Sequence, residues 1–101
     1  MTLWTYRRSF TCRGEAYTVL IETGFKSWRS RLMRGAQELA RDETLVIGAA
    51  LDYRNHRLRR ALPDGAQLEV ETGYISWWST GIAVRVDGVL VHESHPGRAL
   101  M

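Results

Sequence analysis

Two nearly identical seven-residue stretches restrict the fold of this chain more than any other feature. ETGFKSW occupies residues 22–28 and ETGYISW occupies residues 71–77 of a chain of 101 residues. Each is preceded by an Arg-Arg pair, a loop that contains Gly and a run of alternating apolar residues, in that order. Matched features in the same order are typical of a duplicated half-domain, and two copies are too few for a solenoid. We therefore expect one domain over residues 1–101, with half-repeats at about 3–43 and 56–93.

Both copies carry the period-two pattern of half-buried strands. Tyr17, Val19 and Ile21 alternate with more polar neighbours, and Leu68 and Val70 do the same in the second copy. Alternation of β-branched, aromatic and polar residues predicts strands with one face in the core. The expected fold class is all-β, an antiparallel β-sandwich or flattened barrel of about seven or eight strands in two pseudo-repeated halves.

Turn residues join these predicted strands. CRG at 12–14 and PDG at 63–65 end in a Gly that can adopt positive φ. Asp-Gly at 87–88, flanked by apolar residues, predicts a two-residue hairpin turn. That turn sets Val86 against Val89 and Val84 against Val91.

The equivalent hairpin of the first half is expected to turn at Arg34-Gly35. This register sets Met33 against Ala36 and Arg31 against Glu38, an opposite-charge pair across the strands. Gly24 and Gly73 are expected to end their strands at a sharp corner with positive φ.

Two segments are less regular. Residues 42–56 favour a strand at 44–49 followed by a linking turn, and a short helix near 50–55 is the alternative. The last residues, ESHPGRALM, read as a frayed end because they contain Pro and Gly and no apolar alternation.

Composition limits the compartment and the partners. The chain has 14 basic and 11 acidic residues, and a net charge of only +3 argues against strong nucleic-acid binding. No apolar run is long enough to cross a bilayer, and the first residues lack the apolar segment of a signal peptide. The single cysteine, Cys12, excludes an internal disulfide and suits a reducing compartment. We expect a cytoplasmic protein that does not contact membranes.

No motif nominates a catalytic residue, a metal site or a cofactor. Cys12 lies in a predicted turn without a base to activate it, so we interpret it as a loop cysteine. His92 and His95 form an incomplete ligand set, because a zinc site needs three or four protein ligands. The expected protein is therefore not an enzyme and holds no metal or cofactor.

Tryptophan-bearing loops are the best candidates for an interaction surface. SWRSR at 27–31 and SWWSTG at 76–81 occupy equivalent places in the two halves. Loops at the end of a sandwich often carry function, and exposed Trp is common at the centre of protein interfaces. The candidate residues are Trp78, Trp77, Trp28 and Arg29. The alternative is that Trp28 and Trp77 close the ends of the core.

A second candidate surface is basic. Arg7 and Arg8 precede the first alternating run, and Arg59 and Arg60 precede the second. If the two halves pair about a pseudo-twofold axis, these side chains gather into one stripe that suits phosphates or an acidic surface. The alternative is a solvated face with ion pairs to nearby Glu residues.

Several short motifs of this chain resemble those of a known family. The chain resembles the N-terminal β-sandwich domain of the Fas apoptotic inhibitory molecule, through Trp4, the strand from Ile21 to Gly24, Ser27, VIGAA at 46–50 and VDG at 86–88. It departs from that pattern at Met33-Arg34-Gly35. The resemblance implies a compact antiparallel sandwich without catalytic residues that acts through protein contacts.

The sequence thus predicts a small, non-catalytic interaction domain that binds a protein partner. A nucleic-acid-binding module that uses the Arg stripe is the first alternative, and a carbohydrate- or small-ligand-binding sandwich is the second. A homodimer is also compatible with the pattern, because unpaired edge strands invite pairing between chains.

Overall fold

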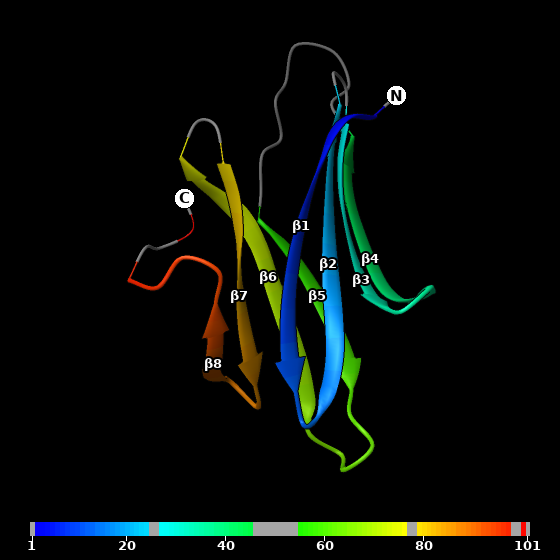
Figure 1. Cartoon of the computed structure of the whole chain (residues 1–101), viewed down its shortest axis with the longest axis vertical. Helices are drawn as coiled ribbons and strands as arrows, with labels where there is room; N and C mark the ends of the chain where they lie inside the picture. The colour runs from blue at the N-terminus through cyan, green and yellow to red at the C-terminus, as the bar shows by residue number, and fades with distance from the viewer. Residues whose placement is uncertain (1, 25–26, 46–54, 77–78, 98–99, 101) are drawn as a thin grey trace.

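The computed structural model describes residues 2–24, 27–45, 55–76, 79–97 and Leu100, and these are all-β. The strands are β1 (Thr2–Cys12), β2 (Glu15–Gly24), β3 (Ser27–Arg34), β4 (Gln37–Leu45), β5 (His56–Ala61), β6 (Gln67–Ser76), β7 (Ser79–Val86) and β8 (Val89–Glu93). Strands β1–β4 form one four-stranded sheet and β5–β8 form another, each in sequence order with antiparallel neighbours (Figure 1). The predicted all-β sandwich is confirmed. No helix in the described ranges is long and apolar enough to cross a membrane.

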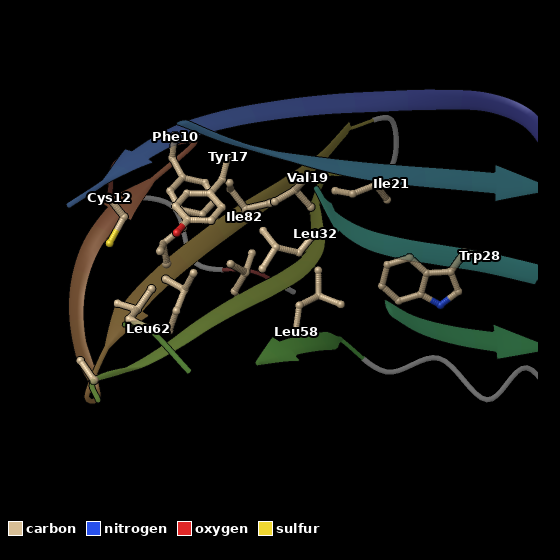
Figure 2. Close-up of a cluster of buried hydrophobic side chains, with 14 residues drawn as sticks. Phe10, Cys12, Tyr17, Val19, Ile21, Trp28, Leu32, Leu58, Leu62 and Ile82 are labelled. Carbon is tan, nitrogen blue, oxygen red and sulfur yellow. The ribbon is translucent and has the colours of Figure 1, made fainter. Parts of the chain in front are cut away.

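The core lies between the two sheets and follows the predicted alternation. Val19, Ile21, Leu68 and Val70 have no exposed surface, and Tyr17 is also buried. Figure 2 shows the stacked rings of Phe10 and Tyr17 at one end of this cluster and the indole of Trp28 toward the other. Burial of these apolar side chains is the main favourable contribution to the stability of the sandwich.

Contacts at both sides of the sandwich fix how the sheets face each other. Strand β5 packs against β4 and β3, whereas β1 packs against β7. On the β1 side, the guanidinium of Arg8 donates to the carbonyl oxygen of Thr80 at 2.8 Å from Nη2 and 3.2 Å from Nε. This charge-assisted contact joins the first sheet to the second.

Two predicted hairpin turns are confirmed. Arg13 and Gly14 have φ of 54° and 79°, and Asp87 and Gly88 have φ of 49° and 83°. Two successive residues at positive φ are typical of a type I′ turn, whose twist matches that of the flanking strands.

The register of the last hairpin is only partly as expected. Val86 pairs with Val89 as predicted, but Val84 pairs with His92 and not with Val91. A β-bulge between Val84 and Arg85 in the pairing accounts for the difference, since it places one extra residue on β8.

The expected register of the β3–β4 hairpin is wrong. The turn occupies residues 35–36, with Gly35 at φ 60°, so Arg34 pairs with Gln37 and Met33 with Glu38. A further shift between Leu32 and Met33 sets Arg31 opposite Arg41. The predicted attraction between Arg31 and Glu38 is nevertheless present, because the long Arg31 side chain reaches diagonally across the strands.

The corner predicted at Gly73 is also wrong. Strand β2 ends at Gly24 as expected, but β6 continues through Gly73 to Ser76, and φ at Gly73 is not positive. The absence of a side chain at Gly73 has a different consequence. A Cβ at Gly73 would lie 2.5 Å from Oδ1 of Asn55, so the missing side chain gives room to the residue that leads into β5.

Of the two irregular segments, the first agrees with expectation where the structure describes it and the C-terminal one does not. Of the strand predicted at 44–49, Thr44 and Leu45 belong to β4, and 46–54 lie outside the described residues. The C-terminal segment is not frayed at Ser94, because its N–H donates to the carbonyl of Ile82 at 3.0 Å. Its Oγ also accepts from the N–H of Ile82 at 2.8 Å.

Candidate functional site

Trp28 belongs to the core and not to an exposed loop. It is the second residue of β3, is 7% exposed, and stacks on the imidazole of His56 with ring centroids 3.6 Å apart and planes 11° apart. This is the role that the alternative interpretation gave it. Trp77 and Trp78 lie outside the described residues, so the candidate surface they would form is not tested.

Arg29, the fourth residue of that candidate surface, is held by an ion pair. Its Nη2 lies 3.0 Å from Oε2 of Glu22, and Arg31 lies 3.4 Å from Oε1 of the same carboxylate. The hydrogen bond from Arg29 is the main reason that the pKa of Glu22 is lowered, and it also raises the pKa of Arg29. Arg29 therefore neutralises a partly buried carboxylate on the outer face of the first sheet.

The same arrangement continues along both outer faces. Arg31 donates to Glu38 at 2.7 Å, and this hydrogen bond is the main cause of a lowered pKa at Glu38. On the second sheet, Arg85 lies 3.2 Å from Glu71, the residue that matches Glu22 in the repeated motif. Positive and negative side chains thus alternate on the outer faces of both sheets, so neither face carries charge of a single sign.

The four arginines of the predicted basic stripe do not form one stripe. Arg7 and Arg8 lie on β1, which packs against β7, whereas Arg59 and Arg60 lie on β5, which packs against β3 and β4. Arg8 turns toward the Thr80 carbonyl, and Arg59 pairs with Glu69 at 3.1 Å. The dispersed placement removes the geometric basis for a phosphate-binding stripe.

A buried polar cluster, which the sequence reading missed, joins the two sheets. Nδ1 of His56 on β5 lies 2.8 Å from Oγ of Ser30 on β3, and Nε2 lies 2.8 Å from Oγ1 of Thr44 on β4. Ser30 Oγ also lies 2.7 Å from Oγ1 of Thr72 on β6. A hydroxyl donates or accepts as its neighbour requires, so these contacts satisfy both imidazole nitrogens within the core.

The serine–histidine contact in this cluster has the separation of a nucleophile and its base. Ser30, His56 and Thr72, however, have no exposed surface. A substrate cannot reach a hydroxyl that is closed off on every side. We conclude that the polar cluster ties the first sheet to the second by specific hydrogen bonds.

A pattern signal for this cluster was present in the sequence. His56 alternates with Leu58, and Ser30 lies between Trp28 and Leu32, all on the core-facing side of their strands. A polar residue on the apolar parity of a strand is expected to find a buried partner. What the sequence does not supply is the pairing between strands far apart in the chain.

The remaining candidate residues gain no chemical role. Cys12 is not a loop cysteine, since it ends β1 and is buried. His92 lies within β8, with its ring 6.1 Å from that of Phe10, and His95 contacts Oγ of Ser94 at 2.9 Å. Within the described part of the chain, no three His, Cys, Asp or Glu residues are grouped so that they could hold a metal ion.

The open edge of the second sheet carries exposed apolar side chains. Val89, Leu90 and Val91 are 65%, 46% and 54% exposed, and they are the large apolar side chains that the described residues leave open to solvent. They are consecutive in β8, which is the last strand of its sheet (Figure 1). Consecutive residues on a strand face opposite sides, so the edge is apolar on both faces.

The turn that precedes β8 determines where its backbone groups point. The residues that flank a two-residue turn exchange hydrogen bonds, so Val89 directs its N–H and C=O toward Val86 on β7. Leu90, the next residue, then directs its own N–H and C=O to the open edge. The edge therefore offers a hydrogen-bond donor and an acceptor between exposed apolar side chains.

Comparison with protein-family models, with curated proteins and with solved structures found no match for this chain.

Proposed function

We propose that this chain is a non-catalytic interaction domain that binds an extended segment of a partner protein along the open edge of β8. The observation that carries the proposal is the exposure of Val89, Leu90 and Val91 on a strand that ends its sheet. Strand addition at such an edge combines main-chain hydrogen bonds with side-chain contacts on alternate residues. Soluble proteins usually protect an open edge with charged residues, and these three positions carry none.

Charge at the two ends of β8 indicates the kind of segment that fits. Asp87 precedes the strand and Glu93 ends it, and neither makes an ion pair in the part of the chain that the structure describes. Asp87 is exposed, and its Oδ1 accepts from the N–H of Gln67 at 2.9 Å. A partner segment with an apolar centre and a Lys or Arg at each end would complement this edge.

The same two acids disfavour a second copy of this chain as the partner. Antiparallel pairing of two β8 strands through the outward groups of Leu90 places Leu90 on the twofold axis. Glu93 of each copy then lies level with Asp87 of the other. Like charges opposite each other destabilise a strand pair, so we assign the edge to a different protein.

The family resemblance and the single cysteine support the proposed protein-binding role and a cytoplasmic location. The resemblance to the Fas apoptotic inhibitory molecule domain implies a sandwich that acts through protein contacts, which agrees with an edge built for strand addition. A single buried cysteine without a disulfide fits a reducing compartment, and we propose the cytoplasm.

The test uses a synthetic peptide as the probe, Ac-Lys-Val-Thr-Val-Thr-Val-Lys-NH2, in a titration followed by NMR. We expect saturable shifts at residues 89–93, and binding about tenfold weaker when both Lys residues are replaced by Glu. Leu90→Pro removes the outward N–H and leaves the hydrogen bonds of Val89 to β7, so it should abolish binding in a folded protein. Leu90→Thr keeps the N–H and serves as the matched variant, which should still bind, although several-fold more weakly than the wild type because apolar surface is lost.

Two results would contradict the proposal. One is equal affinity of the Leu90→Pro and Leu90→Thr proteins, which would mean that main-chain pairing is not used. The other is a dimer, measured by light scattering at micromolar concentration, that the Leu90→Pro substitution dissociates. That result would assign the edge to a second copy of the chain.

A further inference from the structure

A hollow at the far end of the sandwich from Trp28 combines positive charge with an apolar floor. It has a volume of about 250 Å³ and is lined by residues of β2, the β3–β4 hairpin, the end of β5 and the segment that follows β5. Pockets for drug-sized ligands start at about 300 Å³, so this one accepts a small molecule or one or two side chains. None of its lining residues belongs to β8, so the inference is independent of the proposed function.

Two arginines from different sheets line this hollow. Arg34 follows Leu32 by two positions on β3, and Arg60 follows Leu58 by two positions on β5. Alternate residues of a strand share a face, so both arginines stand on the core-facing side of their strands, where the sheets separate. Both are exposed at positions where the strand pattern otherwise places buried apolar side chains.

Neither arginine has a carboxylate partner among the described residues. Nη2 of Arg34 donates to the amide oxygen of Gln37 at 3.3 Å, and no ion pair joins Arg34 or Arg60 to any Asp or Glu there. No acidic residue lines the hollow. By contrast, Arg29 is paired with Glu22 and Arg85 with Glu71.

The rest of the lining consists of apolar side chains. It includes Tyr17 and Leu62, both buried, together with Leu39 and Pro63. Planar guanidinium groups bind carboxylates through two parallel hydrogen bonds, and the apolar side chains beside them can contact the rest of the ligand. We infer that this hollow binds a carboxylate carried on an apolar body. The source is either a free organic acid or an acidic residue of a peptide next to an apolar one.

The inference is tested with 3-phenylpropionate, followed by NMR at Tyr17, Leu39 and Ala61. We expect saturation at millimolar concentration, and about tenfold weaker binding for Arg34→Gln and for Arg60→Gln. Arg7→Gln is the matched control. It removes one exposed arginine that has no ion pair in the described residues but lies on β1, and it should leave the affinity unchanged. The neutral analogue 3-phenylpropanamide should bind at least tenfold more weakly than the acid.

The dipeptides Ac-Phe-Glu-NH2 and Ac-Phe-Gln-NH2 distinguish the two sources. Tighter binding of the Glu dipeptide than of 3-phenylpropionate indicates a peptide ligand, and the reverse indicates a free acid; either order supports the inference. Loss of binding is not explained by misfolding if both Arg variants melt at or above the wild-type temperature, as expected when one of two neighbouring like charges is removed. The inference is overturned if the Arg34 and Arg60 variants bind as Arg7→Gln does, if acid and amide bind equally, or if phenyl phosphate binds more tightly than the acid.

Discussion

The last hairpin of each half ends in a strand of opposite character. In the first half, β4 (Gln37–Leu45) carries Glu38, Arg41, Asp42 and Glu43, and it packs against β5 of the second half. In the second half, β8 (Val89–Glu93) begins with three exposed apolar residues, and it stands at the end of its sheet. The charged edge is thus the one next to the other half, and the apolar edge is the one open to solvent.

The difference shows that the solvent exposure of an edge strand does not by itself explain its residues, because the more exposed strand, β8, is the apolar one. An edge that only had to remain soluble would be expected to carry charge, as β4 does. The polar cluster anchors β4 through Thr44 and His56, whereas β8 is fixed by the turn at Asp87-Gly88 and by the return of Ser94 to Ile82. The comparison therefore separates a strand that holds the two sheets together from a strand whose apolar side chains are exposed to solvent.

The largest expected effect tests the anchor of β4. His56→Ala opens a cavity beside Trp28 and removes the hydrogen-bond partner of Ser30 and Thr44 in the core. We expect the free energy of unfolding to fall by about 3 kcal/mol, from lost packing and unsatisfied hydroxyls together. Urea denaturation followed by tryptophan fluorescence measures this change.

The matched substitution on the other hairpin is His92→Ala. His92 is only half-buried, with its ring 6.1 Å from Phe10, so the loss should stay below about 1 kcal/mol. Equal losses at His56 and His92 would mean that the polar cluster does not hold the sheets together.

The part of the fold that depends on local pattern was predictable from the sequence. Alternation in residues 15–22 and 67–71 predicted β2 and β6, and Asp87-Gly88 predicted the last turn, because side-chain period and turn chemistry are encoded by neighbours. Register was less predictable. A bulge shifts pairing by one residue without changing composition, as at Leu32/Met33, and the repeated ETG letters do not reveal that β6 continues past Gly73.

The sites were less predictable than the fold, because they depend on contacts between distant strands. The sequence predicts Trp28 as an interaction residue, but its indole lies in the core, where it stacks on the imidazole of His56, 28 positions later in the chain. The predicted Arg stripe is wrong for a related reason. The repeats place Arg8 and Arg60 at matching positions, but β1 and β5 lie on different sides of the sandwich. The apolar run VLV at 89–91 was visible in the sequence, and its exposure was not.

The next largest effect concerns the two hairpin turns. Gly35 and Gly88 both have positive φ, 60° and 83°, and a Cβ on either would meet no atom within 4 Å. Substitution by Ala should therefore cost about 1 kcal/mol at each position, from backbone strain alone. Only Gly88→Ala should also weaken binding of the Lys-flanked peptide, since its turn sets the direction of β8. Thermal unfolding and peptide titration measure the two effects, and weaker binding in Gly35→Ala would show that the comparison of the hairpins is wrong.

A smaller effect is expected at the ion pair that supports β3. The lowered pKa of Glu22 means that its stabilising contribution is present above the unfolded-state pKa, near 4.5, and is lost as the pH falls through the folded-state pKa. Arg29→Gln removes the main cause, so the pKa of Glu22 should rise toward its ordinary value and stability at pH 7 should fall by about 0.5 kcal/mol. An NMR titration of the Glu22 carboxyl measures the first change. An unchanged pKa of Glu22 in this variant would mean that Arg31, and not Arg29, is the main cause of the lowered pKa.

The smallest expected effect on stability is the one that best separates the two edges. Val91→Thr replaces a methyl group by a hydroxyl at a position that is 54% exposed. The free energy of unfolding, measured by urea denaturation, should therefore change by less than about 0.5 kcal/mol. Affinity for the Lys-flanked peptide should nevertheless fall several-fold, because the partner strand would bury that methyl group. A loss of stability above about 1 kcal/mol would instead show that Val91 packs within the folded chain, in which case β8 would serve cohesion as β4 does.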